Sequence, residues 1–508
     1  MTSTKKAAKP TKKPLTVDSW FEIKKRGSNV GREVRGGLVT FFTMAYIIVL
    51  NPIIIGTVPD LNGNLVNGMP ISEPGAVPAS MAAVAAATAL LAGLLSIAMG
   101  GIARFPIAVA AGLGLNAMVA YTIVGQGMMS WPAAMGLVFW EGVIITILVF
   151  TGFRKAVFNA VPRSIRSAIS VGIGLFIAFI GLVNGGIVRP AVGTPVQLGI
   201  GGSLEGWPIF TFVFALVLLI VLHVLKVKGA MLIAILSGTV LGMIFQAAFA
   251  PGAAKDDTGA VVNPTGWMSN IPAFDGWGGI DLNLLLIPWK GPFEFFFGGF
   301  ASPVGVLAVI MLIFALMLAD FFDTMGTIVA VGAEGKLLQP DGNPPRTQEI
   351  LVIDSLGAVF GGLASTSSNT SYIESASGVG DGARTGLASI TTGVAFLLAI
   401  FLAPLVNMVP GEAASPALAF VGFLMMAQVL EIKWNDPEEG IPAFFAIILM
   451  PFAYSITVGI GVGFILFVTV KLFRGKAKDV HPLLYVVAIA FLIYFVQGSI
   501  FAAILPPA

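Results

Sequence analysis

The 508-residue chain contains no cysteine and only two histidines, so it lacks much of the side-chain chemistry on which soluble enzymes depend. Without cysteine there is no disulfide, no thiolate metal site and no cysteine nucleophile. His223 and His481 lie beside basic residues rather than among carboxylates, which leaves metal or triad chemistry without its usual ligands. No Walker A sequence occurs, so ATP-driven pumping has no support. We therefore expect neither a cofactor nor a metal ion.

Charged residues are also scarce. They make up 11% of the chain, whereas hydrophobic residues make up 56%; soluble globular chains have roughly 25% and 45–50%. So few charges cannot keep that much apolar surface in water. The composition excludes a soluble enzyme and predicts an all-α polytopic membrane protein whose main solvent is lipid. A net charge of +2 gives no reason to expect a nucleic-acid partner.

What the chain does contain is a series of apolar runs of about 20 residues, the length that crosses the bilayer core. The run 441–470 includes Pro451, so we expect two short helices there and about fourteen membrane elements in all. The last run, 482–504, either spans the membrane or lies on its surface. The runs are 37–55, 79–100, 105–124, 131–151, 167–188, 207–225, 229–250, 301–319, 350–364, 385–409, 417–430, 441–470 and 482–504.

A long polar insertion, 251–294, lies midway along the chain and predicts two membrane repeats of about seven elements, 19–250 and 295–480. A basic tail, residues 1–18, precedes them, and an apolar helix, 481–508, follows. Two inverted repeats with a binding site at the midplane are a common transporter plan. Basic residues gather in alternate loops, which by the positive-inside rule predicts a cytoplasmic N-terminus and an extracytoplasmic insertion.

An ionisable side chain within a membrane span costs roughly 2.5–3.5 kcal/mol on insertion scales, so each one needs a reason. Asp320 and Asp323 end an uncharged run. Thr324 lies four residues after Asp320, and Thr327 lies four residues after Asp323. All four can share one helical face, which predicts a polar stripe along a cavity. The alternative is a helix end at which the aspartates reach water. For Glu141, also in an apolar run, we expect a neighbouring helix to satisfy the carboxylate rather than a site role.

The segment 365–384 is polar although membrane spans flank it on both sides. Its Ser, Thr and Asn side chains compete for backbone hydrogen bonds and so disfavour a regular helix. We expect a broken helix whose free N–H groups face a cavity together with Thr370, Ser371 and Glu374. The alternative is an ordinary loop.

Asn116 lies in an uncharged run just after Gly112 and Gly114. These glycines weaken the helix and free backbone groups for a ligand. The alternative is close helix packing, with Asn116 bonded across an interface. From the residues alone, both interpretations stay open.

Six motifs occur in order from about residue 19 to residue 500. They are Thr40–Pro52, Gly112–Ala117, Asp320–Thr324, Ser371–Ala376, Gly382–Gly386, and the pair Ile441–Phe444 and Met450–Ser455. Together they resemble the motifs of the AzgA-like purine permeases in the nucleobase–cation symporter-2 family. The resemblance implies the uracil-permease-type fold, with about fourteen elements in two inverted sevens. A core domain would hold the substrate between two half-helices, and a gate domain would form the opposite wall.

By this resemblance, the segments around Asn116 and Glu374 hold the two half-helices that meet at the midplane. Asn116 and Glu374 match the family's Asn and Glu on those half-helices, whereas Asp320 and Asp323 match an acidic pair on the eighth span. The substrate-binding residues expected in this way are Asn116, Asp320, Glu374, Thr370 and Ser371. The expected proton-coupling residues are Asp323, Asp320 and Thr324.

The chemistry agrees with a purine, which is a flat, neutral heterocycle with N–H donors and ring-nitrogen acceptors. A carboxylate such as Glu374 accepts two N–H bonds, and an amide such as Asn116 both donates and accepts. Binding a neutral base leaves Asp320 or Asp323 to carry the coupling ion. Because burial favours the protonated form of a carboxylate, we favour H⁺ over Na⁺.

The resemblance therefore implies a secondary transporter that imports adenine, guanine and hypoxanthine across the plasma (inner) membrane by proton symport. The ranking among purines stays open, and a homodimer in the lipid bilayer is a candidate assembly. An anion transporter or channel of the same general fold is the alternative, but its site should be basic or free of carboxylates. An intramembrane hydrolase would need catalytic motifs around Asp320 and Asp323 that the sequence lacks.

Overall fold

The part of the chain described by the computed structural model is helical and membrane-spanning. Ten of its helices are long and apolar enough to cross a membrane, which confirms the predicted polytopic helical membrane protein. Most of the basic tail 1–18 and the end of the insertion 251–294 lie outside the described residues. The described residues are 16–151, 160–191, 193–255, 261–274, 279–280, 305–340 and 343–504.

Helices follow one another along the chain, interrupted by two short pairs of strands. The first half contains α1 (Val17–Phe21), α2 (Val30–Met44), α3 (Ile47–Ile55), α4 (Ala76–Ala98), η1 (Met99–Ala103), β1 (Val109–Ala111), α5 (Leu113–Ala117), η2 (Met118–Val124), α6 (Trp131–Thr151), α8 (Arg163–Asn184), β2 (Val188–Ala191), β3 (Thr194–Leu198), α9 (Trp207–Val224) and α10 (Ala230–Phe249). The second half contains α12 (Gly305–Glu334), α13 (Thr347–Leu363), β4 (Asn369–Ser371), α14 (Ser375–Gly380), α15 (Gly386–Ala399), η5 (Ile400–Met408), α16 (Gly411–Met425), η6 (Met426–Glu431), α17 (Pro437–Phe452), α18 (Ile456–Phe473), η7 (Ala477–Asp479) and α19 (Pro482–Ile504).

Local sequence sets where several helices begin and end. The Asn29 side chain accepts a hydrogen bond from the N–H of Arg32 and so caps α2. The run 441–470 forms two helices, α17 and α18, as predicted. Pro451 lies in the last turn of α17, and the break itself falls at Tyr454, whose φ of 51° is left-handed. Ser455 then caps α18 with its side chain.

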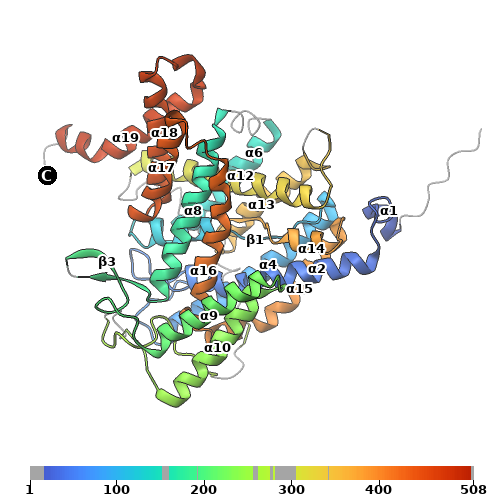
Figure 1. The fold of residues 1–508 in the computed structure, drawn as a ribbon, viewed down its shortest axis with the longest axis vertical. Coiled ribbons are helices and arrows are strands. Elements are labelled where there is room, and N and C mark those ends of the chain that lie inside the picture. Colours follow the sequence, from blue (N-terminus) through green and yellow to red (C-terminus); the bar gives the residue numbers. More distant parts are fainter. Residues whose placement is uncertain are drawn as a thin grey trace, which may run out of the picture.

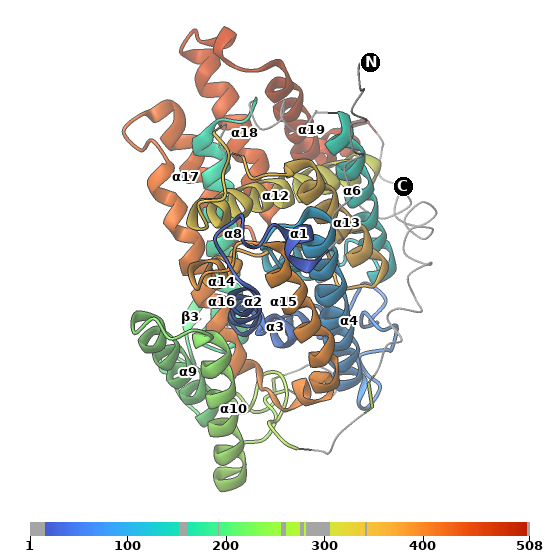
Figure 2. The same ribbon diagram turned by 90° about the vertical axis from the view of Figure 1, so that its right-hand side faces the viewer.

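The helices pack mainly within two groups, which Figures 1 and 2 show from two directions. In the first helix group α2, α4, α6, α13, α14 and α15 contact one another, and in the second helix group α8, α9, α10, α16, α17 and α18 do so. The long helix α12 joins them, because it contacts α6 and α14 of the first group and α8 and α18 of the second. Side chains on α12 therefore contact helices of both groups.

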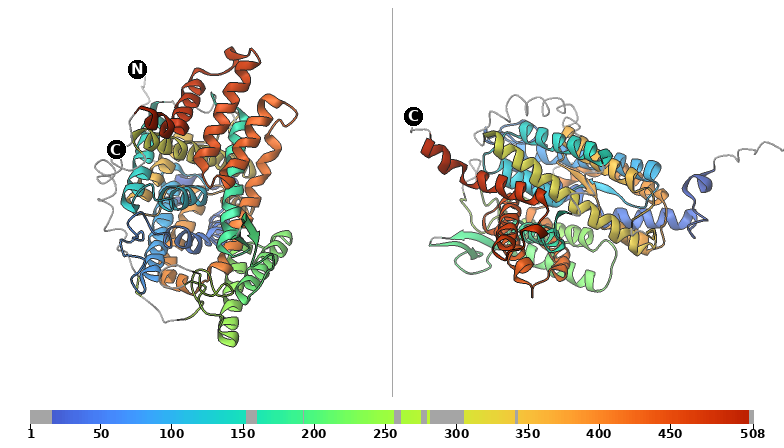
Figure 3. Two further views of the ribbon diagram at one scale, coloured as in Figure 1. Left: turned by 90° about the vertical axis from the view of Figure 1, so that its left-hand side faces the viewer. Right: turned by 90° about the horizontal axis from the view of Figure 1, so that it is seen from above.

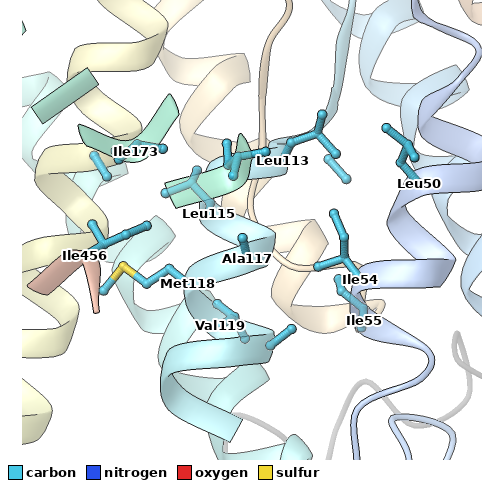
Figure 4. Packing of buried hydrophobic residues seen from close by; sticks show 14 of the residues in the cluster. Leu50, Ile54, Ile55, Leu113, Leu115, Ala117, Met118, Val119, Ile173 and Ile456 are labelled. Atoms are coloured by element: carbon cyan, nitrogen blue, oxygen red, sulfur yellow. The ribbon is translucent and has the colours of Figure 1, made fainter. Parts of the chain in front are cut away.

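Small residues let these helices approach closely, which is how helices associate in lipid. A Cβ atom on Gly100 would lie only 2.2 Å from the carbonyl oxygen of Gly386, so η1 and α15 meet backbone to backbone. Apolar side chains fill the space between the groups. In Figure 4, Leu115 of α5 lies between Ile173 of α8 and Ile54 of α3. The segment after β1 is thus held from both sides.

The C-terminal run 482–504 forms the single helix α19. Its first turns bury Leu484, Val487 and Phe491, and the helix contacts α12 and α18. It lies across α17 and α18 rather than alongside them, and its far end extends away from both helix groups (Figures 1 and 3).

Candidate functional site

Two short strands from distant parts of the chain meet in the middle of the molecule. β1 and β4 pair antiparallel, with Val109 opposite Ser371. β1 leads through Gly112 into α5, and β4 leads into α14 after a short turn. The two segments expected to meet, around Asn116 and Glu374, therefore lie side by side.

The polar segment before β4 is buried because α13 presents glycines to it. A Cβ atom on Gly361 would lie 1.9 Å from the carbonyl oxygen of Ser367, and one on Gly357 would lie 2.5 Å from that of Asn369. The Asn369 amide in turn donates to the carbonyl oxygens of Gly357 and Ser367. Irregular backbone at this depth thus finds its hydrogen-bond partners in protein rather than lipid.

A cavity lies beside the two strands, between the helix groups. The space open to the centre of a water-sized sphere is about 90 Å³, and one water needs roughly 10–15 Å³ on this measure. The cavity therefore has room for several waters or for one small planar molecule. The polar side chains that line it are Tyr46, Ser170, Asp323, Thr327, Thr370, Ser371, Tyr372 and Glu374, and α8 and α16 supply an apolar wall that includes Ile173 and Met425.

Glu374 precedes the first residue of α14 and lines the cavity. Tyr46, at the bend between α2 and α3, donates its phenol hydrogen to Glu374 Oε1. Tyr372 donates its own phenol hydrogen to the carbonyl oxygen of Ala111 over 2.5 Å and ties β4 to β1. Since a carboxylate accepts about four hydrogen bonds, Glu374 keeps acceptor capacity for a ligand.

The four residues predicted to share one face of α12 separate into two pairs. Asp323 and Thr327 line the cavity, whereas Asp320 and Thr324 are buried and are not part of its lining. At about 100° per residue, Asp320 and Asp323 point about 60° apart around the helix. The spacing predicts two neighbouring lines of polar residues, but only the orientation of α12 decides which of them meets the cavity.

Behind the lining, Asp354 of α13 organises a buried network that sequence reasoning missed. Its Oδ1 accepts hydrogen bonds from the backbone N–H of Ser371, at 2.9 Å, and from the Ser371 hydroxyl, at 2.7 Å. Its Oδ2 accepts one from Thr324 at 2.7 Å, and the Thr370 hydroxyl lies 2.7 Å from that of Thr324. The sequence did contain an indication, because Asp354 is an acid within the apolar run 350–364. An acid in an apolar run was also the reason for selecting Asp320.

Asn116 is fully buried and lies outside the cavity lining. Its Nδ2 donates to Asn51 Oδ1 over 2.6 Å, and the Asn51 amide donates to Thr88 Oγ1 and to the Thr366 carbonyl oxygen. Asn116 thus joins α3, α4 and the segment before β4. Sequence reasoning missed Asn51. Its presence as the one polar side chain in the otherwise apolar α3 could have indicated a buried hydrogen bond.

The expectation for Glu141 is wrong. The side chain is fully buried in α6, but neither carboxylate oxygen has a hydrogen-bond donor among the described residues. Among the helices that the structure describes, none donates a hydrogen bond to it, even though α13 packs so closely that a Cβ atom on Gly142 would lie 2.5 Å from the nitrogen of Val359.

A helical membrane protein with a small, acid-lined cavity between two helix groups has the architecture of a transporter. The chain matches the model of the family described as Permease family (Xan_ur_permease) over residues 31–465. It belongs to this family. The resemblance inferred from the motifs is thereby confirmed, as is the expectation of a transporter rather than an enzyme.

Named relatives match nearly end to end. The guanine/hypoxanthine permease PbuG of Bacillus subtilis (strain 168) is 37% identical over 482 residues, covering 94% of this chain and 99% of PbuG. The adenine permease AdeP of Escherichia coli (strain K12) is 34% identical over 476 residues, covering 94% of this chain and 95% of AdeP. Among solved structures, the transmembrane domain of the cyanobacterial bicarbonate transporter BicA matches with a TM-score of 0.54 at 14% identity, covering 85% of this chain and 96% of that one. That last likeness shows a shared fold alone.

Proposed function

We propose that this protein transports purine nucleobases, with adenine, guanine and hypoxanthine as the candidate substrates, by proton symport. The observation that carries the proposal is an acid-lined cavity of suitable size in a chain whose full-length relatives are named as permeases for these bases. Family and cavity support the same conclusion from independent directions.

The cavity has polar groups to bind the edge of a flat base and an apolar wall to cover its face. Glu374 accepts N–H groups from the ring edge, and the hydroxyls of Thr370 and Ser371 both donate and accept. The first N–H groups of the helix that starts at Leu113 have no acceptor within that helix and suit a ring nitrogen or carbonyl oxygen. The apolar wall from α8 and α16 covers the ring face. Among the described lining residues none is basic, which disfavours the anion alternative.

Proton coupling is assigned in this proposal to Asp323, which lines the same cavity as Glu374. A proton on Asp323 would travel with the neutral base and would offset the charge that the site otherwise carries. Asp320, Thr324 and Asn116 belong to the proposed site as the buried layer behind the lining, and Asn116 acts through Asn51.

We also propose the finer architecture expected from the sequence. The first helix group would be the core domain and the second the gate domain, in two inverted repeats of seven elements, 19–250 and 295–480. Supporting this, β1 and β4 are antiparallel and each leads into a short helix, as a two-fold relation between broken helices requires. The N-terminus would be cytoplasmic, 251–294 extracytoplasmic, and the protein a plasma-membrane homodimer.

Calorimetric titration of purified protein with adenine, guanine, hypoxanthine, uracil and bicarbonate tests the substrate class. We expect one or more purines to bind saturably and Glu374→Gln to weaken that binding by at least about tenfold, because hydrogen bonds to a charged acceptor contribute roughly 1.5–3 kcal/mol. Glu73→Gln, at an exposed loop position, is the matched control and should bind as the parent does. Binding of bicarbonate but of no purine would overturn the proposal.

A further inference from the structure

Glu141, in the middle of α6, is a buried acid to which the proposed function assigns no role. Its carboxyl group is fully buried without a hydrogen-bond donor among the described residues. The charged group that acts on it is Asp354, on the neighbouring helix α13. A buried, unpaired carboxylate beside a second carboxylate is strongly unfavourable, so one of the two must be neutral.

The hydrogen bonds decide which of the two carries the proton. Asp354 accepts three, from the N–H and hydroxyl of Ser371 and from Thr324. Donors of this kind stabilise the ionised form of a carboxyl group. Glu141 has none. The arrangement therefore places the proton on Glu141 and the negative charge on Asp354.

The other charged residues within the two helices that pack against α6 are all acidic. α12, which packs against α6, contributes Asp320, Asp323 and, at its end, Glu334, while α13 contributes Glu349 and Asp354. Glu374 and Tyr372, which line the cavity, are two further groups on this side of the molecule that can carry only negative charge. α6, α12 and α13 contain no Lys, Arg or His. With no basic side chain on these helices, a proton is the simplest charge that neutralises one of the two carboxyl groups.

The pair is connected to the cavity through its hydrogen-bond donors. Ser371 and Thr370 both line the cavity, Ser371 donates to Asp354, and Thr370 contacts Thr324, which also donates to Asp354. A ligand that engages these hydroxyls withdraws stabilisation from the Asp354 anion. Occupancy of the cavity and the position of the proton are therefore linked.

We propose that Glu141 and Asp354 form a second proton site of the transport cycle, behind the cavity and separate from Asp323 and Glu374. With the cavity empty, Glu141 carries the proton and Asp354 the negative charge. When a base engages the hydroxyls of Ser371 and Thr370, the Asp354 anion loses stabilisation and the equilibrium position of the one proton shifts from Glu141 toward Asp354. The net charge of the pair does not change in this step. The inference rests on the proposed function for the identity of the ligand, but not for the proton on Glu141.

Infrared difference spectroscopy on purified protein tests the two parts separately. In ligand-free protein, Glu141→Gln should remove one carbonyl band of a protonated carboxylic acid, whereas Glu349→Gln, at an α13 position paired with Arg346, should remove none. Adding adenine should shift the Glu141 band in the parent protein. Asp354→Asn should keep that band and lose the adenine-induced shift, which covers the case in which Glu141→Gln fails to fold.

Identical acid bands in the parent and in Glu141→Gln would overturn the inference even if purines are transported. A band that Glu141→Gln removes but that adenine does not shift, in protein that binds adenine, would overturn the transfer step. If the parent binds no purine at all, the proposed function fails, and the ligand-free band still decides whether Glu141 is protonated.

Discussion

At the scale of single residues, the site depends on which groups hold Glu374. Tyr46 donates to one of its oxygens and is itself almost fully buried. The phenol thereby fixes the direction of the carboxylate toward the cavity. Tyr46 is a positioning residue in this account, because it acts on the substrate through Glu374.

Tyr46→Phe removes the phenol hydroxyl and leaves the ring. We expect the KM for the preferred purine to rise roughly tenfold, because a hydrogen bond to a charged acceptor contributes about 1.5–3 kcal/mol, while the maximal rate changes less. Uptake kinetics at several substrate concentrations measure this. Tyr485→Phe is the matched control, since its hydroxyl donates to Ala477 far along the chain. Equal KM values for Tyr46→Phe and the parent would contradict the role.

At the scale of elements, glycines of α13 allow this helix to pack directly against the backbone of the polar segment that leads into β4. Gly361→Ala would place a methyl group 1.9 Å from the Ser367 carbonyl oxygen. We expect this overpacking to cost about 1–3 kcal/mol of stability. We also expect weaker purine binding, because a shift of Ser367 would displace Thr370 and Ser371, which come shortly after it in the chain and line the cavity. Thermal unfolding and calorimetric titration in detergent measure both effects.

Gly326→Ala on α12 is the control for that substitution, because its Cβ would meet nothing within 4 Å. Alanine stabilises a helix interior by roughly 0.5–1 kcal/mol relative to glycine. Its stability should match or exceed that of the parent. If Gly361→Ala behaved in the same way, the tight packing of α13 against the polar segment would be refuted.

The sequence predicts some features of these elements well, such as polar segments between apolar spans, but it does not predict how a helix is rotated against its neighbours. The polarity of 365–384 between apolar spans predicts a ligand-facing segment. In the structure this segment pairs, through β4, with the strand just before α5 and Asn116. Spacing placed Asp320 and Asp323 near one face, but only the rotation of α12 against its neighbours puts Asp323 at the cavity and Asp320 behind it. That rotation is set by tertiary packing. For the same reason Asp354 and the unsatisfied Glu141 became visible only in three dimensions.

At the scale of the whole molecule, one ion pair joins the two helix groups among the described residues. Asp381, which follows α14, pairs with Arg35 of α2 and with Lys228, in the connection between α9 and α10. The Lys228 ammonium, with Arg35 beside it, holds the pKa of Asp381 below its ordinary value. The pairing therefore stabilises the fold above the ordinary carboxyl range and is lost as pH falls through the lowered pKa.

Asp381→Asn should lower the stability of the purified protein at neutral pH by about 0.2–1 kcal/mol, the range for exposed pairs. The difference should shrink in high salt and vanish in acid. A double-mutant cycle with Lys228→Met, followed by thermal unfolding, isolates the pair. Additive effects of the two substitutions would show that Asp381 and Lys228 do not couple the groups.

Uptake of labelled bases tests most directly whether this protein is a proton-coupled purine permease. Adenine, guanine, hypoxanthine, xanthine and uracil would be supplied to cells that lack their own purine permeases, with and without a protonophore, for the parent and for Asp323→Asn. We expect saturable purine uptake that collapses with the proton gradient in the parent, and loss of gradient-driven uptake in Asp323→Asn protein that reaches the membrane. Absence of purine uptake by parent protein at the membrane, or uptake indifferent to the protonophore, would contradict this expectation.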